Sequence, residues 1–189
     1  MSVEEHARSR TLQVVVGLAV RGTNAVAGWL AVPDGDDALT VVAAESADAS
    51  LRVPDGHRLD LERSYGGFVL ATSQPASLQL VAHDDRAGAE LALLGTSRGH
   101  LLAVPCADDD DQVAVLEVVA GEDRGRFDLD DVELLSILGE VAGAAVVESL
   151  GGVAPPTADE LAGQLRQLER SDPAGFGRVA PLVNSLLRR

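Results

Sequence analysis

A serine in a G-x-S-x-G pattern is the first residue of this chain that could do chemistry. Residues 95–99 place Ser97 where hydrolases carry a nucleophile, at a sharp turn between a strand and a following helix. Here the order is reversed, because the hydrophobic pattern predicts a helix over 85–94 and a strand from His100. His100 is also the last histidine, so no later histidine can serve as the base. We interpret the segment as a helix stop in which Ser97 can line a pocket.

The other reactive residue types do not form a catalytic or metal-binding set. Cys106 is the only cysteine, so an internal disulfide is impossible, and a small apolar side chain at a strand end is favoured over a redox thiol or a cofactor anchor. The 4 histidines lack the spacing of a zinc site, and the acidic run 108–111 lacks the glycine and late glutamate of an EF-hand. The chain contains no lysine, which excludes a P-loop. We therefore expect no metal, no cofactor and no enzymatic activity.

The charge of the chain argues against two classes of partner. Its 30 acidic and 15 basic residues give a net charge of -15, which repels nucleic-acid backbones and anionic membrane surfaces. The first residues lack the basic region of a signal peptide, and the apolar run 12–20 is too short to cross a bilayer. A single cysteine suits a reducing compartment. We expect a cytoplasmic protein that binds neither nucleic acid nor membrane.

Hydrophobic periodicity divides residues 1–150 into alternating helices and strands. Apolar residues at helical spacing predict a long helix at each end, over 2–22 and 128–150. Pro-Asp-Gly turn signals separate short apolar runs that we interpret as strands. Between the long helices we expect strands at 25–32, 39–44, 57–61, 76–81, 100–105 and 113–119, and short helices at 65–73 and 85–94.

A helical tail follows the first domain. The Gly/Pro-rich segment 151–156 reads as a linker, and 157–189 is expected to form two amphipathic helices. The first begins with Thr157-Ala158-Asp159-Glu160, a capping-box pattern. Because an isolated amphipathic helix gains little stability until its apolar face is buried, we expect the tail to dock on the domain, a sister subunit or a partner protein.

Three local motifs, in this order, carry a family resemblance. They are Val53-Pro54-Asp55-Gly56 ahead of the segment 65–75, then Ser97-x-x-x-Leu101-Leu102-Ala103-Val104-Pro105, and finally Phe127-Asp128-x-x-Asp131-x-x-Leu134-Leu135. Together with the order of elements, these motifs resemble a GAF domain over about residues 5–149. The tail beyond residue 150 has no counterpart in the basic family pattern.

The resemblance implies an α+β fold with a central antiparallel sheet of five or six strands. One face would carry the terminal helices, which in this family commonly build homodimers. The other face would hold a small-molecule pocket roofed by 65–72 and 83–97. The lysine of the family's cyclic-nucleotide signature is missing, so that ligand is not indicated. The residues expected around the pocket are Trp29, Tyr65, Phe68, His83, Asp84, Leu94, Ser97, Leu102, Val104 and Val115.

Three functional hypotheses follow. The first is a regulatory domain in signal transduction that binds a small molecule and acts through dimerisation or a partner protein, an assignment that rests on family analogy. The second is a ligand-free dimerisation or scaffold module. An enzyme ranks last, because no paired catalytic groups can be assembled. The residues expected at a dimer or partner interface are Val15, Leu138, Val141, Ala145, Leu182 and Leu186.

Overall fold

The structure is a computed structural model that describes residues 3–47, 56–88, 90–91, 97–108 and 111–150, together with Arg166 and Arg170. The chain divides into two units, Met1–Leu150 and Gly151–Arg189. In the second unit, Arg166 and Arg170 are helical and exposed. The expected linker at 151–156, most of the tail, and the interface residues Leu182 and Leu186 lie outside the described residues.

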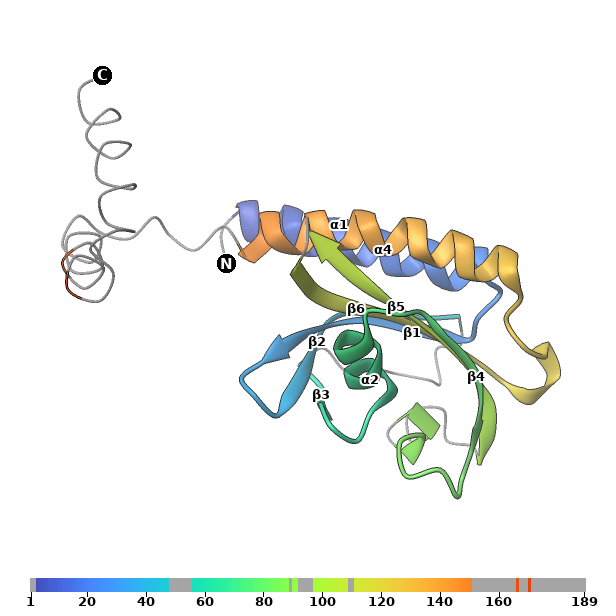
Figure 1. The fold of residues 1–189 in the computed structure, drawn as a ribbon. Coiled ribbons are helices and arrows are strands. Elements are labelled where there is room, and N and C mark those ends of the chain that lie inside the picture. Colours follow the sequence, from blue (N-terminus) through green and yellow to red (C-terminus); the bar gives the residue numbers. More distant parts are fainter. Residues whose placement is uncertain are drawn as a thin grey trace. The chain divides into compact units, whose positions relative to one another are not determined.

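Six antiparallel strands form one sheet in the first unit (Figure 1). Their order is β3-β2-β1-β6-β5-β4, so the pairing of β1 with β6 joins two halves that are each continuous in sequence. The expected α+β fold and sheet are confirmed, and each expected strand is present with bounds that differ by a few residues. The strands are β1 (Ala27–Asp34), β2 (Ala38–Ser46), β3 (Arg58–Asp60), β4 (Ala76–Val81), β5 (Arg98–Asp108) and β6 (Asp111–Ala120).

Two long helices cover one face of the sheet (Figure 1). They are α1 (Val3–Gly22) and α4 (Leu129–Leu150), and they run antiparallel, since Gly22 at the end of α1 lies against Leu134 near the start of α4. A Cβ on Gly143 would overlap the carbonyl oxygen of Ala107, so α4 approaches β5 more closely than a larger residue would allow. None of the described helices combines the length and apolar character needed to span a membrane.

A short helix, α2 (Tyr65–Thr72), packs over the other face (Figure 1). Ser64 caps its start by accepting a hydrogen bond from the Gly67 N–H (3.1 Å), and Ser73 ends it with a left-handed backbone at φ 53°. A second helix was expected over 85–94; of this segment the structure describes 85–88, 90 and 91, and the backbone is helical at 88, 90 and 91. The sheet therefore separates two apolar cores, one under α1 and α4 and one under α2.

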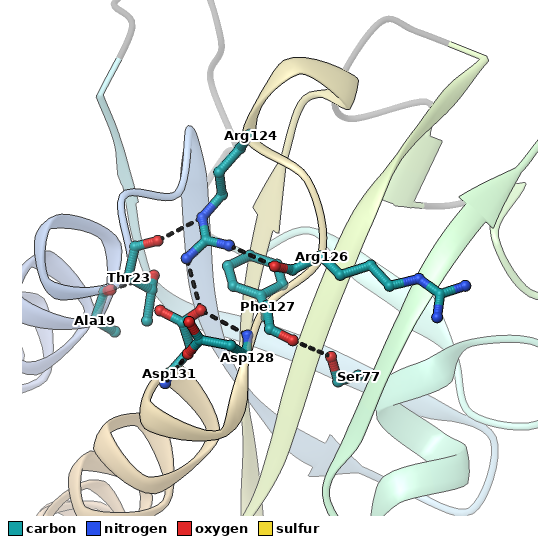
Figure 2. A network of polar contacts seen from close by, with 8 residues as sticks. All are labelled: Ala19, Thr23, Ser77, Arg124, Arg126, Phe127, Asp128 and Asp131. Atoms are coloured by element: carbon teal, nitrogen blue, oxygen red, sulfur yellow. Dashed lines mark hydrogen bonds and ion pairs between the residues drawn. The ribbon is translucent and has the colours of Figure 1, made fainter.

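Arg124 links the end of α1 to the start of α4 (Figure 2). It lies at the end of the 3-10 turn η1 (Glu122–Arg124) and donates from Nε to the Thr23 carbonyl oxygen (2.7 Å). Its Nη2 donates to Asp131 Oδ2 (2.7 Å), and its guanidinium lies 4.2 Å from the ring centre of Phe127. Asp131 also accepts a hydrogen bond from the N–H of Asp128 (2.9 Å) and donates its own N–H to Asp128 Oδ1 (3.1 Å), so Asp131 ties the arginine to the cap of α4.

Candidate functional site

Four of the ten residues expected around the pocket lie on the α2 side of the sheet. Trp29 and Val115 project from β1 and β6 into the core under α2, and both are fully buried. Tyr65 opens α2, and Asp84 follows β4 in a turn. These four residues come from separate parts of the sequence and meet on one face of the sheet.

The expectation that Leu102 and Val104 line this pocket is wrong. Both belong to the core under α1 and α4, and the alternate residues of β5, Leu101 and Ala103, face α2 instead. Strand β5 is buried on both faces, so its apolar residues do not alternate with polar ones and the sequence does not reveal which set faces which helix.

The remaining expected pocket residues are peripheral or not described. Phe68 on α2 is 38% exposed and lies under the guanidinium of Arg86, whose central carbon is 5.2 Å from the ring centre. The side chains of His83 and Ser97 are exposed. Leu94 lies outside the described residues.

A buried acid that sequence reasoning missed occupies the middle of this face. Glu117 is fully buried on β6, directly opposite Trp29 of β1 on one side and Ala103 of β5 on the other. Burial raises the pKa of Glu117 well above its usual value, and the charge of Glu90 raises it further. The Trp29 side chain partly offsets this rise, although its indole N–H does not reach Glu117 with the geometry of a hydrogen bond.

A second buried acid, Glu90, lies at the first turn of α2. Its Oε1 accepts a hydrogen bond from the Tyr65 N–H (3.2 Å). Burial raises the pKa of Glu90 from 4.5 to about 7, while its hydrogen bonds to backbone N–H groups oppose the rise. A Cβ on Gly66 would lie 2.5 Å from Glu117 Oε1. The two carboxyls therefore approach consecutive residues of the same helical turn.

Tyr65 links this pair to the edge of the site. Its hydroxyl donates a short hydrogen bond to Asp84 Oδ2, and burial together with this bond raises the pKa of Tyr65 to about 12. The same hydrogen bond lowers the pKa of Asp84, and the backbone N–H of Arg86 donates to the other carboxylate oxygen (2.9 Å). Asp84 is therefore the ionised member of the cluster.

Four buried polar atoms of this cluster find no hydrogen-bond partner among the described residues. They are both carboxyl oxygens of Glu117, Oε2 of Glu90 and Nε1 of Trp29. Buried polar groups are nearly always hydrogen-bonded, because an unpaired one costs on the order of 1–3 kcal/mol. Four such atoms therefore lie together on one face, and the described residues do not complete their hydrogen bonding.

Other features of the described residues carry less chemistry. A groove of about 530 Å³ lies between α2 and the ends of β1 and β6, where Phe68, Pro33 and Gln112 line it, and the buried acids are not part of it. Cys106 is buried under α4, where burial raises the pKa of its thiol to about 12. No group of three potential metal ligands is found in the part of the chain that the structure describes.

The residues expected at a dimer interface are mostly turned inward. Val15 and Ala145 are buried in the core under the long helices, and Leu138 packs against that core. Val141 is 48% exposed, as an interface residue would be. The exposed apolar residues beside it form what we call the α1/α4 stripe, which consists of Val14, Leu18, Ile137 and Val141.

Sequence signals for the two missed acids are present but weak. Glu117 is the one charged residue within the apolar run 113–120, at a position where a strand buried on both faces has no polar side. Glu90 stands among Ala and Leu in a segment with helical character, where an acid usually marks the solvent side. Only the packing of α2 brings the two together.

Comparison with known proteins places the chain. The GAF domain family model matches residues 5–147. The chain is similar to the GAF-B domain of DevS from Mycobacterium smegmatis, with a TM-score of 0.60 and 18% identity over 76% of this chain and 96% of that one. It is similar to the GAF domain of a phosphoenolpyruvate-protein phosphotransferase from Coxiella burnetii, with a TM-score of 0.62 and 17% identity over 78% and 87%.

A third similar structure is an enzyme, the free methionine-R-sulfoxide reductase of Neisseria meningitidis in complex with its substrate. Its TM-score is 0.59, at 18% identity over 77% of this chain and 81% of that one. No curated protein matches the sequence. At such identities the solved structures establish the fold alone, whereas the family model covers most of the chain. The chain therefore belongs to the GAF domain family, a family of sensory and regulatory domains.

Proposed function

We propose that this chain is a non-catalytic regulatory domain that binds a small molecule between the sheet and α2. The observation that carries the proposal is the set of unpaired buried polar atoms on Glu117, Glu90 and Trp29. A fold selected only for stability would fill this face with apolar side chains, as it does under α1 and α4. Family membership supports the same reading.

The non-catalytic part rests on the chemistry of the available side chains. The thiol of Cys106 is buried and protonated, and it lies on the opposite face of the sheet from the cluster. In the part of the chain that the structure describes, no hydrogen bond joins either buried acid to a serine or a histidine. Proton transfer alone therefore remains available to the cluster, and we assign its carboxyls to binding.

A ligand screen tests the proposal. Trp29 is the only tryptophan and lies in the site, so its fluorescence reports binding directly, and thermal unfolding reports it independently. We expect at least one compound of a metabolite library to change both signals. Ala103→Val, which crowds the strand position beside Glu117, should weaken binding at least tenfold.

The matched control is Leu102→Met, a volume-conserving change on the opposite face. It should leave the affinity of the same compound unchanged. If no compound of any charge changes the fluorescence or the melting temperature, and native mass spectrometry finds only the bare chain, the proposed function is wrong.

A second candidate function is dimerisation through the long helices, and the α1/α4 stripe favours it. Val14 and Leu18, and likewise Ile137 and Val141, are spaced by four residues and therefore share one face of their helix. Light scattering at micromolar concentration should give a dimer, and Ile137→Glu should give a monomer. Glu62→Gln, a change at an exposed residue outside the long helices, is the control that should leave the mass unchanged. If the wild type is a monomer, dimerisation through the α1/α4 stripe is ruled out.

Two further expectations stay predictions. Signalling through a partner protein would use the tail, which can be removed by deleting 153–189 to see whether assembly or partner binding changes. The cytoplasmic location rests on the sequence alone.

A further inference from the structure

The unpaired atoms of the site have a clear donor and acceptor balance. Both oxygens of Glu117 and Oε2 of Glu90 are acceptors in their ionised form, whereas Nε1 of Trp29 is a donor only. A complementary molecule must therefore bring several N–H or O–H donors. It needs only one acceptor, to which the indole N–H of Trp29 can donate a hydrogen bond.

Among the described residues, no ion pair joins an arginine to either of these acids. The ion pairs among the described residues involve Arg58, Arg98 and Arg124, none of which contacts Glu117 or Glu90, and the chain has no lysine. Ionising both carboxyls in an apolar core is costly without a counter-charge, and burial together with their mutual repulsion therefore raises their pKa values. Whatever completes the site should carry that charge.

A metal ion does not fit the surroundings. Calcium takes roughly six to eight oxygen ligands and magnesium about six. Around Gly66, which approaches Glu117 Oε1, the other nearest side-chain atoms are instead aliphatic carbons of Leu39 and Val115. No group of three potential metal ligands exists among the described residues. Hydrocarbon walls beside a pair of carboxyls suit an organic cation, whose carbon body can pack against them.

We infer that the ligand of this domain is a small organic molecule with a protonated amine, which the carboxyls of Glu117 and Glu90 bind beside the first turn of α2. The ammonium group offers three N–H donors for the three unpaired carboxyl oxygens. Trp29 donates its indole N–H to an acceptor on the same molecule. This inference rests on the proposed function, because it names the chemical class that the same site recognises.

Paired compounds test the charge. The probes are ethylamine, propylamine and benzylamine, each matched with the alcohol of the same carbon skeleton, and 1,4-diaminobutane is added as a longer cation. We expect at least one amine to quench or shift the Trp29 fluorescence and raise the melting temperature in phosphate buffer, with at least tenfold higher affinity than its alcohol. Equal affinity of amine and alcohol would overturn the inference.

Two variants test the residues. Glu117→Gln and Glu90→Gln keep the side-chain shape and remove the charge, and each should weaken amine binding at least tenfold. The matched control is Glu62→Gln, because Glu62 is exposed and lines the groove beside α2 rather than the buried acid cluster. It should bind the amine as the wild type does. Circular dichroism identifies any variant that fails to fold, and amine binding that survives both substitutions contradicts the assignment.

The pH profile separates binding from a structural role. The ionisable groups around the site are Glu117, Glu90, Asp84, Tyr65 and, beyond them, Arg86. Because an ammonium group displaces the proton of a raised-pKa carboxyl, amine affinity in the wild type should rise at least tenfold between pH 5 and pH 8. In the doubly substituted variant, any residual affinity should be independent of pH. A flat profile in the wild type would contradict the inference.

The outcomes also separate this inference from the proposed function. If neutral or anionic compounds of the metabolite library bind and no amine does, the ligand class is wrong and the binding function stands. If no compound of any charge binds, both are wrong.

Discussion

The two faces of the sheet treat buried polar groups in opposite ways. Where α1 ends and α4 begins, Arg124 and Asp131 satisfy each other and the neighbouring backbone (Figure 2). One polar atom on that side, Nδ1 of His100, has no partner among the described residues, and burial together with Arg126 and Arg124 lowers the pKa of this histidine. Under α2, the acids Glu117 and Glu90 are buried without an opposite charge.

This difference separates stability from function within one small domain. The ion pair of Arg124 and Asp131, with its hydrogen bonds to the backbone, holds the end of α1 to the start of α4. It leaves no unpaired group that a ligand could bind. Unpaired carboxyls lower the stability of the ligand-free protein, and such local costs persist where binding requires them. If the proposed function holds, the same sheet carries a structural side and a recognition side.

The largest expected effect tests whether the α2 side is rigidly built. A Cβ on Gly67 would overlap the carbonyl oxygen of Leu61, a backbone atom that has no room to move away. Gly67→Ala should therefore reduce the free energy of unfolding by about 3 kcal/mol or more, measured by urea denaturation. Trp29 fluorescence should change before the helical circular dichroism does, because α2 covers the Trp29 side of the sheet.

The control for this variant is Gly88→Ala. Gly88 is exposed and has open space where the Cβ would be, so the free energy of unfolding should stay within about 0.5 kcal/mol. A harmless Gly67→Ala would mean that α2 is loosely seated and the contrast between the faces is overstated.

The next effect tests the paired side. Arg124→Ala leaves Asp131 and the Thr23 carbonyl without their partner, and the side chains of Arg124 and Asp131 are only 19% and 11% exposed. We expect a loss of about 2–3 kcal/mol in urea denaturation, below the range for a fully buried pair. Ligand affinity should not change, since Arg124 lies on the opposite side of the sheet. A simultaneous loss of binding would show that the two faces are coupled.

The third effect tests the cost of the unpaired acids. The folded protein raises the pKa of Glu90 from 4.5 to about 7, so between these values the folded state holds a proton that the unfolded state releases. Stability of the ligand-free wild type should therefore fall as pH rises through this window, by about 2–3 kcal/mol from this residue. Glu90→Gln should remove that part of the decline.

Urea denaturation at pH 4.5 and pH 7.5, in phosphate or acetate rather than an amine buffer, gives this difference. Glu62→Gln serves again as the exposed control and should follow the wild-type profile. If stability changes with pH equally in Glu90→Gln and in the wild type, burial does not raise the pKa of Glu90.

The smallest effect concerns a surface ion pair that belongs to neither face. Arg58 lies 3.2 Å from Asp34, with side chains 57% and 49% exposed. Arg58→Ala should change the free energy of unfolding by less than about 1 kcal/mol, and added salt should reduce even that. A larger loss of unfolding free energy would show that contacts at the β2–β3 edge, and not only the two cores, stabilise the domain.

The sequence predicted the fold better than the site, for a physical reason. Turn chemistry and helical periodicity act locally, so the elements and their order could be read from residues such as the Pro33-Asp34-Gly35 turn, where Gly35 adopts φ 75°. Which face of the sheet a strand residue lies on depends on the elements that pack against that strand. On β5, buried on both sides, the choice between Leu102 and Ala103 had no local signal.

The prediction of which residues of the long helices are exposed failed for the same reason. Helix α4 has apolar residues on more than one side, so the pattern alone did not separate the core residue Ala145 from the exposed Ile137. The two acids were missed for a different reason, since their role depends on the approach of Gly66 to Glu117. That approach joins positions fifty-one residues apart in the sequence.

The position of β6 beside β1 also determines when the domain can form during synthesis. Residues 27–31 find their second pairing partner only in residues 115–119, so the β1–β2 hairpin emerges from the ribosome with one long edge open. Loop closure over such a distance is slow compared with hairpin formation, and open strand edges invite pairing with other chains. The first half of the chain must therefore stay unaggregated until the last strand is made, and the two-fold excess of acidic over basic residues supplies the repulsion that keeps neighbouring nascent chains apart.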